Sequence, residues 1–290
     1  MRLGQVGIWW SGSWGSDAAE TRDLGSEMEE LGYSAIWMSG GFNPGLSDRF
    51  RRLLAATNSI PVASGIVSIW HTTPHHVAEG VAGLDRDFPG RFILGLGASH
   101  ALAVDQAEPR YTRPFSRMVQ FLDELDRVDP LVPVDRRVLA ALGPKMLALA
   151  AARTAGAHPY FVPVEHTYRA REVLGAGPLL APEQGVVLES DPDRAREVAR
   201  SYTSGYLRLP NYTNNLRSLG FGDKDLAGAG SDRLVDAIVA WGDEATIEIR
   251  LQDHFSAGAD HVAIQVIPPS DDRRFPRDTY RRLASFLTAV

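Results

Sequence analysis

The 290-residue chain contains no cysteine. This absence excludes a disulfide-stabilised scaffold, a thiolate nucleophile, and zinc or iron–sulfur sites with cysteine ligands. Redox chemistry in such a chain therefore requires a bound organic cofactor.

Basic residues are too few for a nucleic-acid-binding surface. The chain has 36 Asp and Glu against 30 Lys and Arg, which gives a net charge of −6. Binding to nucleic acid depends on clustered Lys and Arg that neutralise phosphates. The composition favours a small-molecule substrate as the partner, with no nucleic acid.

Long apolar runs are also missing. None approaches the roughly 20 residues of a membrane-spanning helix. The chain starts with a strand-like run at residues 3–10, without the basic start and cleavage site of a signal peptide. We therefore expect a cytoplasmic protein that does not contact a membrane.

Two common catalytic signatures do not occur. There is no H-E-x-x-H motif, and the spacing of His71 and His75 is interrupted by Pro74, which places His71 outside the helix. There is also no G-x-S-x-G elbow for a nucleophilic serine. We expect no metal site, and a metal-dependent hydrolase is a disfavoured alternative.

What the sequence does contain is an alternation of strand-like runs with segments of helical apolar spacing. This pattern predicts one α/β domain over residues 1–290, folded as a (β/α)₈ TIM barrel. A doubly wound open sheet is the alternative, but residues 11–16 lack the glycine spacing of a dinucleotide-binding turn. The predicted strands are residues 3–10, 34–38, 62–70, 91–97, 137–142, 158–162, a run within 179–188, and 261–267.

A late insertion at residues 208–230 interrupts the repeat. We expect it to be rich in loops and to form a lid over the barrel mouth, because long insertions in barrels usually lie over the site. The alternative is a static excursion that packs against helices or a dimer partner. Its polar residues and candidate hinges are Asn211, Tyr212, Asn214, Asn215, Gly220, Gly222, Gly228 and Gly230.

Five of the six tryptophans lie at or just beyond the carboxyl ends of the first three predicted strands, namely Trp9, Trp10, Trp14, Trp37 and Trp70. These ends share the face of a barrel that carries the site. Such a cluster can line a slot for a planar ring, and we predict Trp14, Trp37 and Trp70 in the substrate pocket. The alternative is that the tryptophans fill the barrel or pack under helices.

Two strand-to-helix turns have features of ligand-binding turns. After the fourth strand, Gly97, Ala98 and Ser99 leave the backbone open to a ligand, although a tight turn needs the same residues. After the fifth, Gly143-Pro144-Lys145 combines a helix N-terminus with a positive charge, which suits a phosphate. An ordinary βα turn is the alternative for this segment.

At these residues the chain resembles the luciferase-like monooxygenase family, in particular its F420-dependent branch. The resemblance implies hydride transfer between coenzyme F420 and an unidentified small organic substrate, in a homodimer. An FMN-dependent monooxygenase and a catalytically silent flavin-binding protein are the alternatives. The matching segments are residues 63–70, 89–97, 137–144, 157–162, 180–184 and 209–212.

The resemblance also implies where the cofactor binds. Family members commonly hold a non-prolyl cis peptide behind the ring, at the end of strand three, and by position this is Gly65-Ile66. Contacts to the ring and tail carry over to Ser64, Gly97, Ala98 and Ser99. Contacts to the tail phosphate carry over to Ala141, Leu142, Gly143, Pro144 and Lys145.

The chain departs from the family after strand two. Sugar-phosphate dehydrogenases of the family carry an Asp-His pair there, whereas this chain has Ser39-Gly40-Gly41 after Trp37-Met38. The acid–base residue is therefore open, and the candidates at strand ends are His71, His100 and Glu183.

Overall fold

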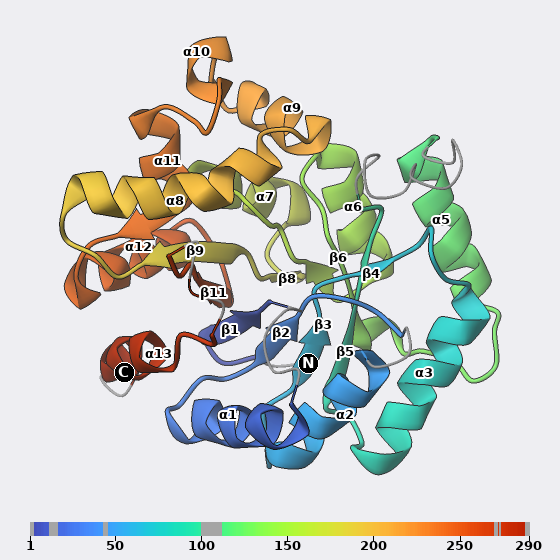
Figure 1. Ribbon diagram of the computed structural model, residues 1–290. Coiled ribbons are helices and arrows are strands. Elements are labelled where there is room, and N and C mark those ends of the chain that lie inside the picture. Colours follow the sequence, from blue (N-terminus) through green and yellow to red (C-terminus); the bar gives the residue numbers. More distant parts are fainter. Residues whose placement is uncertain are drawn as a thin grey trace.

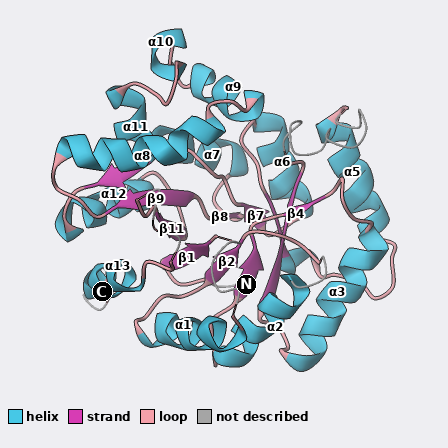
Figure 2. Ribbon diagram, viewed as in Figure 1, coloured by secondary structure: helices cyan, strands magenta, loops and turns pink. Residues whose placement is uncertain are grey.

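The computed structural model describes residues 3–11, 17–42, 46–99, 112–269, 272 and 274–287. Its centre is a parallel sheet that curls on itself, with helices around the outside (Figures 1 and 2). The strands of the barrel are β1 (Val6–Trp10), β2 (Ile36–Met38), β3 (Val62–Ser64), β5 (Phe92–Gly97), β6 (Arg137–Leu139), β7 (Gly156–Ala157), β8 (Leu179–Leu180), β9 (Glu183–Val187) and β11 (Val262–Val266).

One continuous segment closes this sheet. β8 pairs with β7, and β9, which follows after only two residues, pairs with β11. β11 in turn pairs with β1, so residues 179–187 complete a ring of eight parallel strand positions. The predicted (β/α)₈ barrel is confirmed. Two short strands are added to it: β4 (Val67–Ser68) pairs with β5, and β10 (Val239–Trp241) pairs with β9.

Helices follow most of the strands and cover the sheet. Several begin with proline at the first helical position. Proline lacks a backbone N–H, and an N–H at this position would have no acceptor within the helix. The helices described are α1 (Ala18–Glu30), α2 (Leu46–Ala56), α3 (Pro74–Asp87), α5 (Pro114–Leu125), α6 (Pro144–Arg153), α7 (Val164–Leu174), α8 (Pro192–Tyr206), α9 (Pro210–Ser218), α10 (Asp223–Leu226), α11 (Asp232–Ile238), α12 (Glu244–Ser256) and α13 (Arg277–Leu283).

The core has an inner and an outer part. Inside the barrel, alternate strand positions supply Trp37, Ala63, Ile93 and Val138, all fully or almost fully buried. The opposite faces of the strands pack against the surrounding helices in a larger apolar cluster. A parallel sheet buried on both sides requires such near-continuous apolar strands.

The sixth strand lies earlier than predicted. It is β7 at Gly156–Ala157; the His158 N–H still donates to the Leu139 carbonyl at 2.8 Å, but residues 158–162 form no strand. Pro159 has no N–H to contribute to a ladder, and Phe161 adopts a positive φ of 57°, so the apolar run here is not a strand.

The expectation of a loop-rich insertion at 208–230 is also wrong. Residues 210–218 form α9, and a shorter α10 follows. Pro210 occupies the first helical position, and Tyr212 and Leu216, four residues apart, are buried on one face. The Asn and Gly content of the segment concealed this amphipathic pattern.

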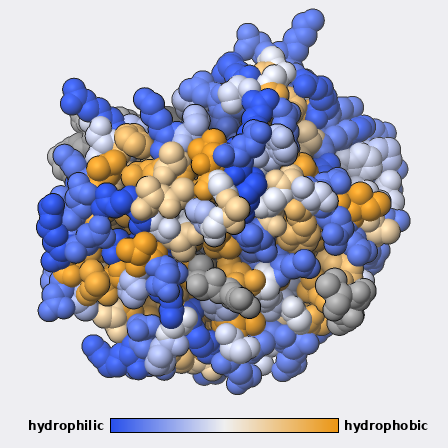
Figure 3. Space-filling view, turned by 180° about the vertical axis from the view of Figure 1, so that it is seen from behind, coloured by the Kyte–Doolittle hydropathy of each residue, from blue (hydrophilic) through white to orange (hydrophobic). Residues whose placement is uncertain are grey.

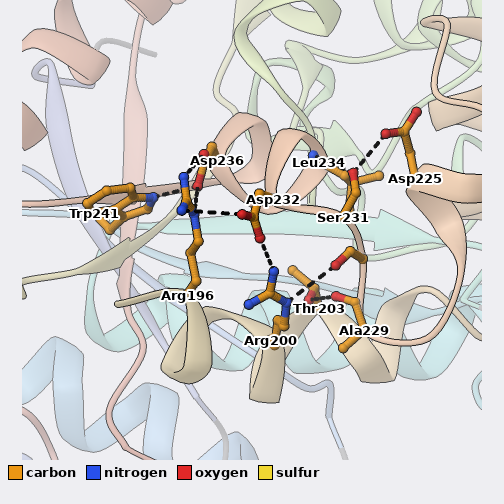
Figure 4. A network of polar contacts seen from close by, with 11 residues as sticks. Arg196, Arg200, Thr203, Asp225, Ala229, Ser231, Asp232, Leu234, Asp236 and Trp241 are labelled. Carbon is orange, nitrogen blue, oxygen red and sulfur yellow. Dashed lines mark hydrogen bonds and ion pairs between the residues drawn. The ribbon is translucent and has the colours of Figure 1, made fainter. Parts of the chain in front are cut away.

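Charged side chains hold α11, which follows the insertion, to α8 (Figure 4). Arg196 forms ion pairs with Asp236 and Asp232 at 2.6 and 3.3 Å, and Trp241 donates its indole N–H to Asp236 at 2.8 Å. Arg200 pairs with Asp232 as well. Thus α11 and β10 are anchored to α8, and Asp225 of α10 joins the same network through Ser231 and Arg233, while Figure 4 labels no residue of α9.

The surface on the far side from the view of Figure 1 mixes hydrophobic patches with a hydrophilic surround (Figure 3). The patches offer area for the predicted homodimer, which stays a prediction. Among the described helices, none combines the length and apolar character that crossing a membrane requires.

Candidate functional site

A cavity of about 470 Å³ opens at the carboxyl ends of the barrel strands. Its wall contains Ser39 after β2, Gly65 after β3, Ala98 after β5, Ala140 after β6 and His158 after β7. Barrel enzymes place their sites on this face because the strand-following loops converge there. The cavity is therefore the candidate site.

Most of the predicted cofactor-binding residues lie in the wall of this cavity. The Gly65-Ile66 peptide among them is cis, as the resemblance implies. Their contact with a cofactor stays a prediction. The wall residues from that set are Gly65, Ile66, Ala98, Ser99, Ala141, Leu142 and Gly143.

Ser64 and Gly97 lie behind the wall instead. The Ser64 hydroxyl donates to the Gly95 carbonyl at 3.1 Å and accepts from the Gly95 N–H at 2.9 Å, which joins β3 to β5. At Gly97, a Cβ would come within 2.5 Å of the Ile66 Cδ1 atom. Neither residue lies in the cavity wall, and contact of either one with a cofactor stays a prediction.

The predicted phosphate turn is the start of α6. Gly143 is the N-terminal cap of the helix and lies in the cavity wall, and nothing stands within 4 Å of the position of a Cβ there. Pro144 and Lys145 are exposed in the first turn, beside the cavity and not in its wall. A helix start of this kind presents unpaired amides to an anion.

Of the tryptophans predicted for the substrate pocket, the two that the structure describes lie outside the cavity wall. Trp37 is fully buried inside the barrel, where its ring stacks on His158 with centroids 4.1 Å apart and its N–H donates to His261 Nε2 at 3.0 Å. Trp70 is half-buried and donates to the Ala98 carbonyl at 2.7 Å, which braces the turn after β5 from outside the wall. Trp14 lies outside the described residues. The position of a residue at a strand end does not show whether its side chain faces into the barrel. That orientation decides what Trp37 and Trp70 contact.

The three acid–base candidates occupy different places. His71 is exposed in the cavity wall, and His100 lies outside the described residues. Glu183 is buried behind the wall, and burial raises its pKa to about 8 against the opposing effect of hydrogen bonds from the Phe161 N–H and the Tyr202 hydroxyl. In the part of the chain that the structure describes, no three His, Asp or Glu side chains gather as a metal site would require.

A cluster of tyrosines, not foreseen from the sequence, separates Glu183 from the cavity. Tyr160, Tyr206 and Tyr212 lie in the wall, and the hydroxyls of Tyr160 and Tyr206 are 2.8 Å apart. Burial raises the pKa of Tyr206 to about 12, so its hydroxyl keeps its proton at neutral pH. Burial also raises the pKa of Tyr160, so the Tyr160 and Tyr206 hydroxyls are protonated hydrogen-bonding groups of the wall. The sequence signal for this cluster was the spacing of Tyr202 and Tyr206, which are one helical turn apart on α8 and therefore lie on the same face of the helix.

Two nitrogen atoms of the wall have no hydrogen-bond partner among the described residues, Trp9 Nε1 and His158 Nε2. Their side chains are only 7% and 1% exposed. Buried polar atoms are nearly always paired, so these two indicate a ligand or water in the cavity. Together with the small-residue wall and the open start of α6, they suit a planar ring with polar edges and a phosphate-bearing tail.

Comparison with known proteins agrees with this geometry. Residues 5–129 match the luciferase-like monooxygenase family. The resemblance inferred from the sequence is confirmed. No curated protein sequence matches the chain.

Solved structures with the same fold cover almost the whole of this chain. An F420-dependent secondary alcohol dehydrogenase, in complex with an F420–acetone adduct, shares 14% identity over 100% of this chain and 98% of that chain, with a TM-score of 0.73. The coenzyme F420-dependent tetrahydromethanopterin reductase from Methanopyrus kandleri shares 16% over 98% of both, with a TM-score of 0.70. The oxygenating constituent of 3,6-diketocamphane monooxygenase from Pseudomonas putida, in complex with FMN, shares 14% over 98% and 96%, with a TM-score of 0.69.

We predict that Glu183→Gln changes how stability depends on pH. The carboxyl has an ordinary pKa of 4.5 and a folded-state pKa of about 8, so the native protein binds this proton more tightly than the unfolded chain. The contribution of the protonated Glu183 carboxyl to the stability of the folded protein is complete below a pH of about 4.5. This contribution is lost as the pH rises through about 8. The free energy of unfolding of the wild type should therefore fall relative to the variant across that range, in urea titrations. The exposed Glu172 provides a control variant, Glu172→Gln, and a pH-independent difference at Glu183 would contradict the assignment.

The predicted lid now has a sharper form. Asn211 and Tyr212 of α9 lie in the cavity wall, whereas α11 is ion-paired to α8. In hydrogen-exchange mass spectrometry with saturating F420, we expect peptides from α9 to gain protection and peptides from α11 to stay unchanged. Equal exchange of α9 with and without F420 would contradict a lid and favour a static excursion.

Proposed function

We propose that this protein is an F420-dependent oxidoreductase that transfers a hydride between the deazaflavin and a small organic substrate. The observation that carries the proposal is the cavity at the carboxyl ends of the strands, with its wall of small residues between the Gly65-Ile66 turn and the open start of α6. The family match and the two F420-dependent neighbours support it.

The residues present divide the binding task between them. Gly65, Ile66 and Ala98 offer a flat wall for the ring, and Ser64 and Gly97 hold that wall in place from behind. The amides at the start of α6 receive the tail phosphate. A bound deazaflavin supplies a ring carbon that accepts or gives a hydride, and the protein orients the reactants and excludes water.

FMN-dependent oxygenation is the second candidate, because one neighbour of the same fold was solved in complex with FMN. The same wall accommodates either ring system. Deazaflavin suits hydride transfer but reacts poorly with oxygen, so the cofactor largely decides the reaction class.

Titration of the purified protein with F420 and, separately, with FMN tests the proposal. We expect saturable changes in cofactor fluorescence and absorbance with F420 and at least tenfold weaker binding of FMN. Tighter binding of FMN would transfer the proposal to the monooxygenase. Binding of neither cofactor would remove both functions, and binding without turnover of any small alcohol, aldehyde or alkene would favour a silent binding protein.

Lys145→Ala tests the phosphate end of the site. Loss of one charged group near the tail should weaken F420 binding by about 1 kcal/mol, or roughly fivefold. Lys224→Ala on α10 removes the same charge from an exposed position outside the cavity wall and should leave the affinity unchanged. An equal affinity of the Lys145 variant and the wild type, in a folded protein, would count against this placement.

A further inference from the structure

Glu183, the first residue of β9, is a buried carboxyl that has no part in cofactor binding. Its side chain is 1% exposed, with the Phe161 N–H 3.1 Å from Oε2 and the Tyr202 hydroxyl 3.3 Å from Oε1. Burial raises its pKa to about 8, and no basic side chain of the described residues is among the groups that shift this pKa. The carboxyl therefore carries a proton at neutral pH.

The Tyr202 hydroxyl connects this carboxyl to the cavity. Tyr202 and Tyr160 share a side-chain hydrogen bond that acts on the pKa of both. The Tyr160 hydroxyl in turn lies 2.8 Å from that of Tyr206, and both of these tyrosines belong to the cavity wall. A continuous chain of groups, each with one acidic hydrogen, thus leads from Glu183 to the wall.

The titratable groups that face Glu183 are all tyrosines. Their charges would act on the carboxyl from three directions: Tyr202 and Tyr206 lie on α8, Tyr160 lies after β7, and Tyr280 lies on α13. Burial raises the pKa of each, so all four are neutral at neutral pH. The carboxyl is consequently the group of this cluster that releases a proton most easily.

The hydrogen bonds of Tyr160 leave its oxygen able to receive a proton. At rest its hydrogen is donated to Gln265 Oε1 at 2.7 Å. A hydroxyl has one hydrogen and two acceptor lone pairs. Tyr160 can therefore accept a proton from one neighbour while its own hydrogen leaves, and its net charge does not change.

We propose that Glu183 stores the proton that a substrate needs when it is reduced, and that Tyr202 and Tyr160 pass this proton to the cavity. This rests on the proposed oxidoreductase function and assigns the acid of that reaction. A substrate that accepts a hydride from reduced F420 gains one hydrogen with two electrons, and it then needs one proton. Both tyrosines keep their hydrogen count, and Glu183 is left as a carboxylate.

Three O–H bonds break in this sequence, on Glu183, Tyr202 and Tyr160. Two form again on the tyrosines, and the third proton ends on the substrate. The carboxylate regains its proton from water through the same chain once the product has left. Oxidation of a substrate would use the same steps in reverse, with the carboxylate as the final acceptor.

A purely structural role for Glu183 makes a different prediction. Its Oε2 atom accepts from the N–H of Phe161, whose φ of 57° is unusual for a residue other than glycine. A glutamine offers the same acceptor but has no acidic proton. Glu183→Gln therefore separates support of this turn from the storage of a proton.

Infrared difference spectroscopy of the full chain without cofactor tests whether the proton is shared. Raising the pH through about 8 should remove the C=O band of the protonated Glu183 carboxyl. In the same step we expect shifts of tyrosine bands, identified by ring-¹³C labelling. Glu183→Gln should abolish both changes, and Glu172→Gln, at an exposed position, should keep both.

Two tyrosine variants show how far the coupling extends. Tyr202→Phe should abolish the tyrosine shifts and move the carboxyl step to higher pH, because its hydrogen bond lowers the pKa of Glu183. Tyr160→Phe should remove part of the tyrosine signal. Tyr168→Phe changes a side chain that is 56% exposed on α7, and this control should alter neither signal. A tyrosine signal unaffected by Tyr160→Phe would end the chain at Tyr202 and overturn the proposal.

A pH profile tests delivery of the proton to a substrate. Menadione is the probe, because a quinone becomes a hydroquinone when it gains one hydride and one proton. With saturating reduced F420, the rate of the wild type should fall as the pH rises through about 8, where Glu183 loses its proton. Glu183→Gln should lower the rate at neutral pH about a hundredfold, as expected for loss of a positioned acid, and should remove this fall.

Fluorescence titration with F420 distinguishes failure of this proposal from failure of the proposed function. A chain that does not bind F420 loses the proposed function, whereas the infrared coupling is measured without cofactor. Binding of F420 with a carboxyl step that shifts no tyrosine band overturns the role of Glu183 alone. A pH profile that Glu183→Gln leaves unchanged overturns it as well. If menadione is not reduced, the infrared measurements decide.

Discussion

Closure of the parallel sheet by residues 179–187 is the constraint on which the rest of the structure depends. The first part of the segment pairs with β7 and the last part with β11, so all strand ends are brought into one ring. The same segment supplies the Ala181 carbonyl that sets the tautomer of His158, and it carries Glu183 behind the tyrosines. Any shift of register here would displace both the fold and the cavity wall.

Inside the barrel, buried side-chain nitrogens have fewer hydrogen-bond partners the nearer they lie to the cavity. His261 is satisfied on both nitrogens, by the Gly4 carbonyl and by Trp37. His158, stacked on Trp37, is satisfied on one nitrogen only, and Trp9 is left unpaired by the described residues. Unpaired buried groups cost stability, and they are retained where a ligand completes them. The buried nitrogens without a partner thus lie at the cavity end of the barrel interior.

The insertion contributes to the same wall from outside the barrel. α8 carries Tyr202 and Tyr206 toward the cavity, while its other side is held to α11 by Arg196 and Arg200. α9 then adds Asn211 and Tyr212. The ion pairs to α11 fix α8 and its tyrosines, whereas α9 contributes no labelled residue to the network of Figure 4, and this difference is the physical basis of the proposed lid.

The sequence by itself determined the α/β class, because apolar periodicity alternates between strand and helix along the chain, whereas closure of the sheet depends on the pairing of residues 179–187 with both β7 and β11. It also located the turn at Gly143, since a glycine and a proline between a strand and a helix have a local signature, while Gly65 was located only through the family resemblance. It did not decide which tryptophan faces the cavity: Trp9 and Trp37 both lie on strands, and neighbouring β1 and β2 place one at the wall and the other within the core. Nor did it reveal that Trp9 Nε1 and His158 Nε2, on residues just over half the chain apart, both lack a partner among the described residues. Whether a buried nitrogen is satisfied depends on tertiary neighbours that no local pattern encodes.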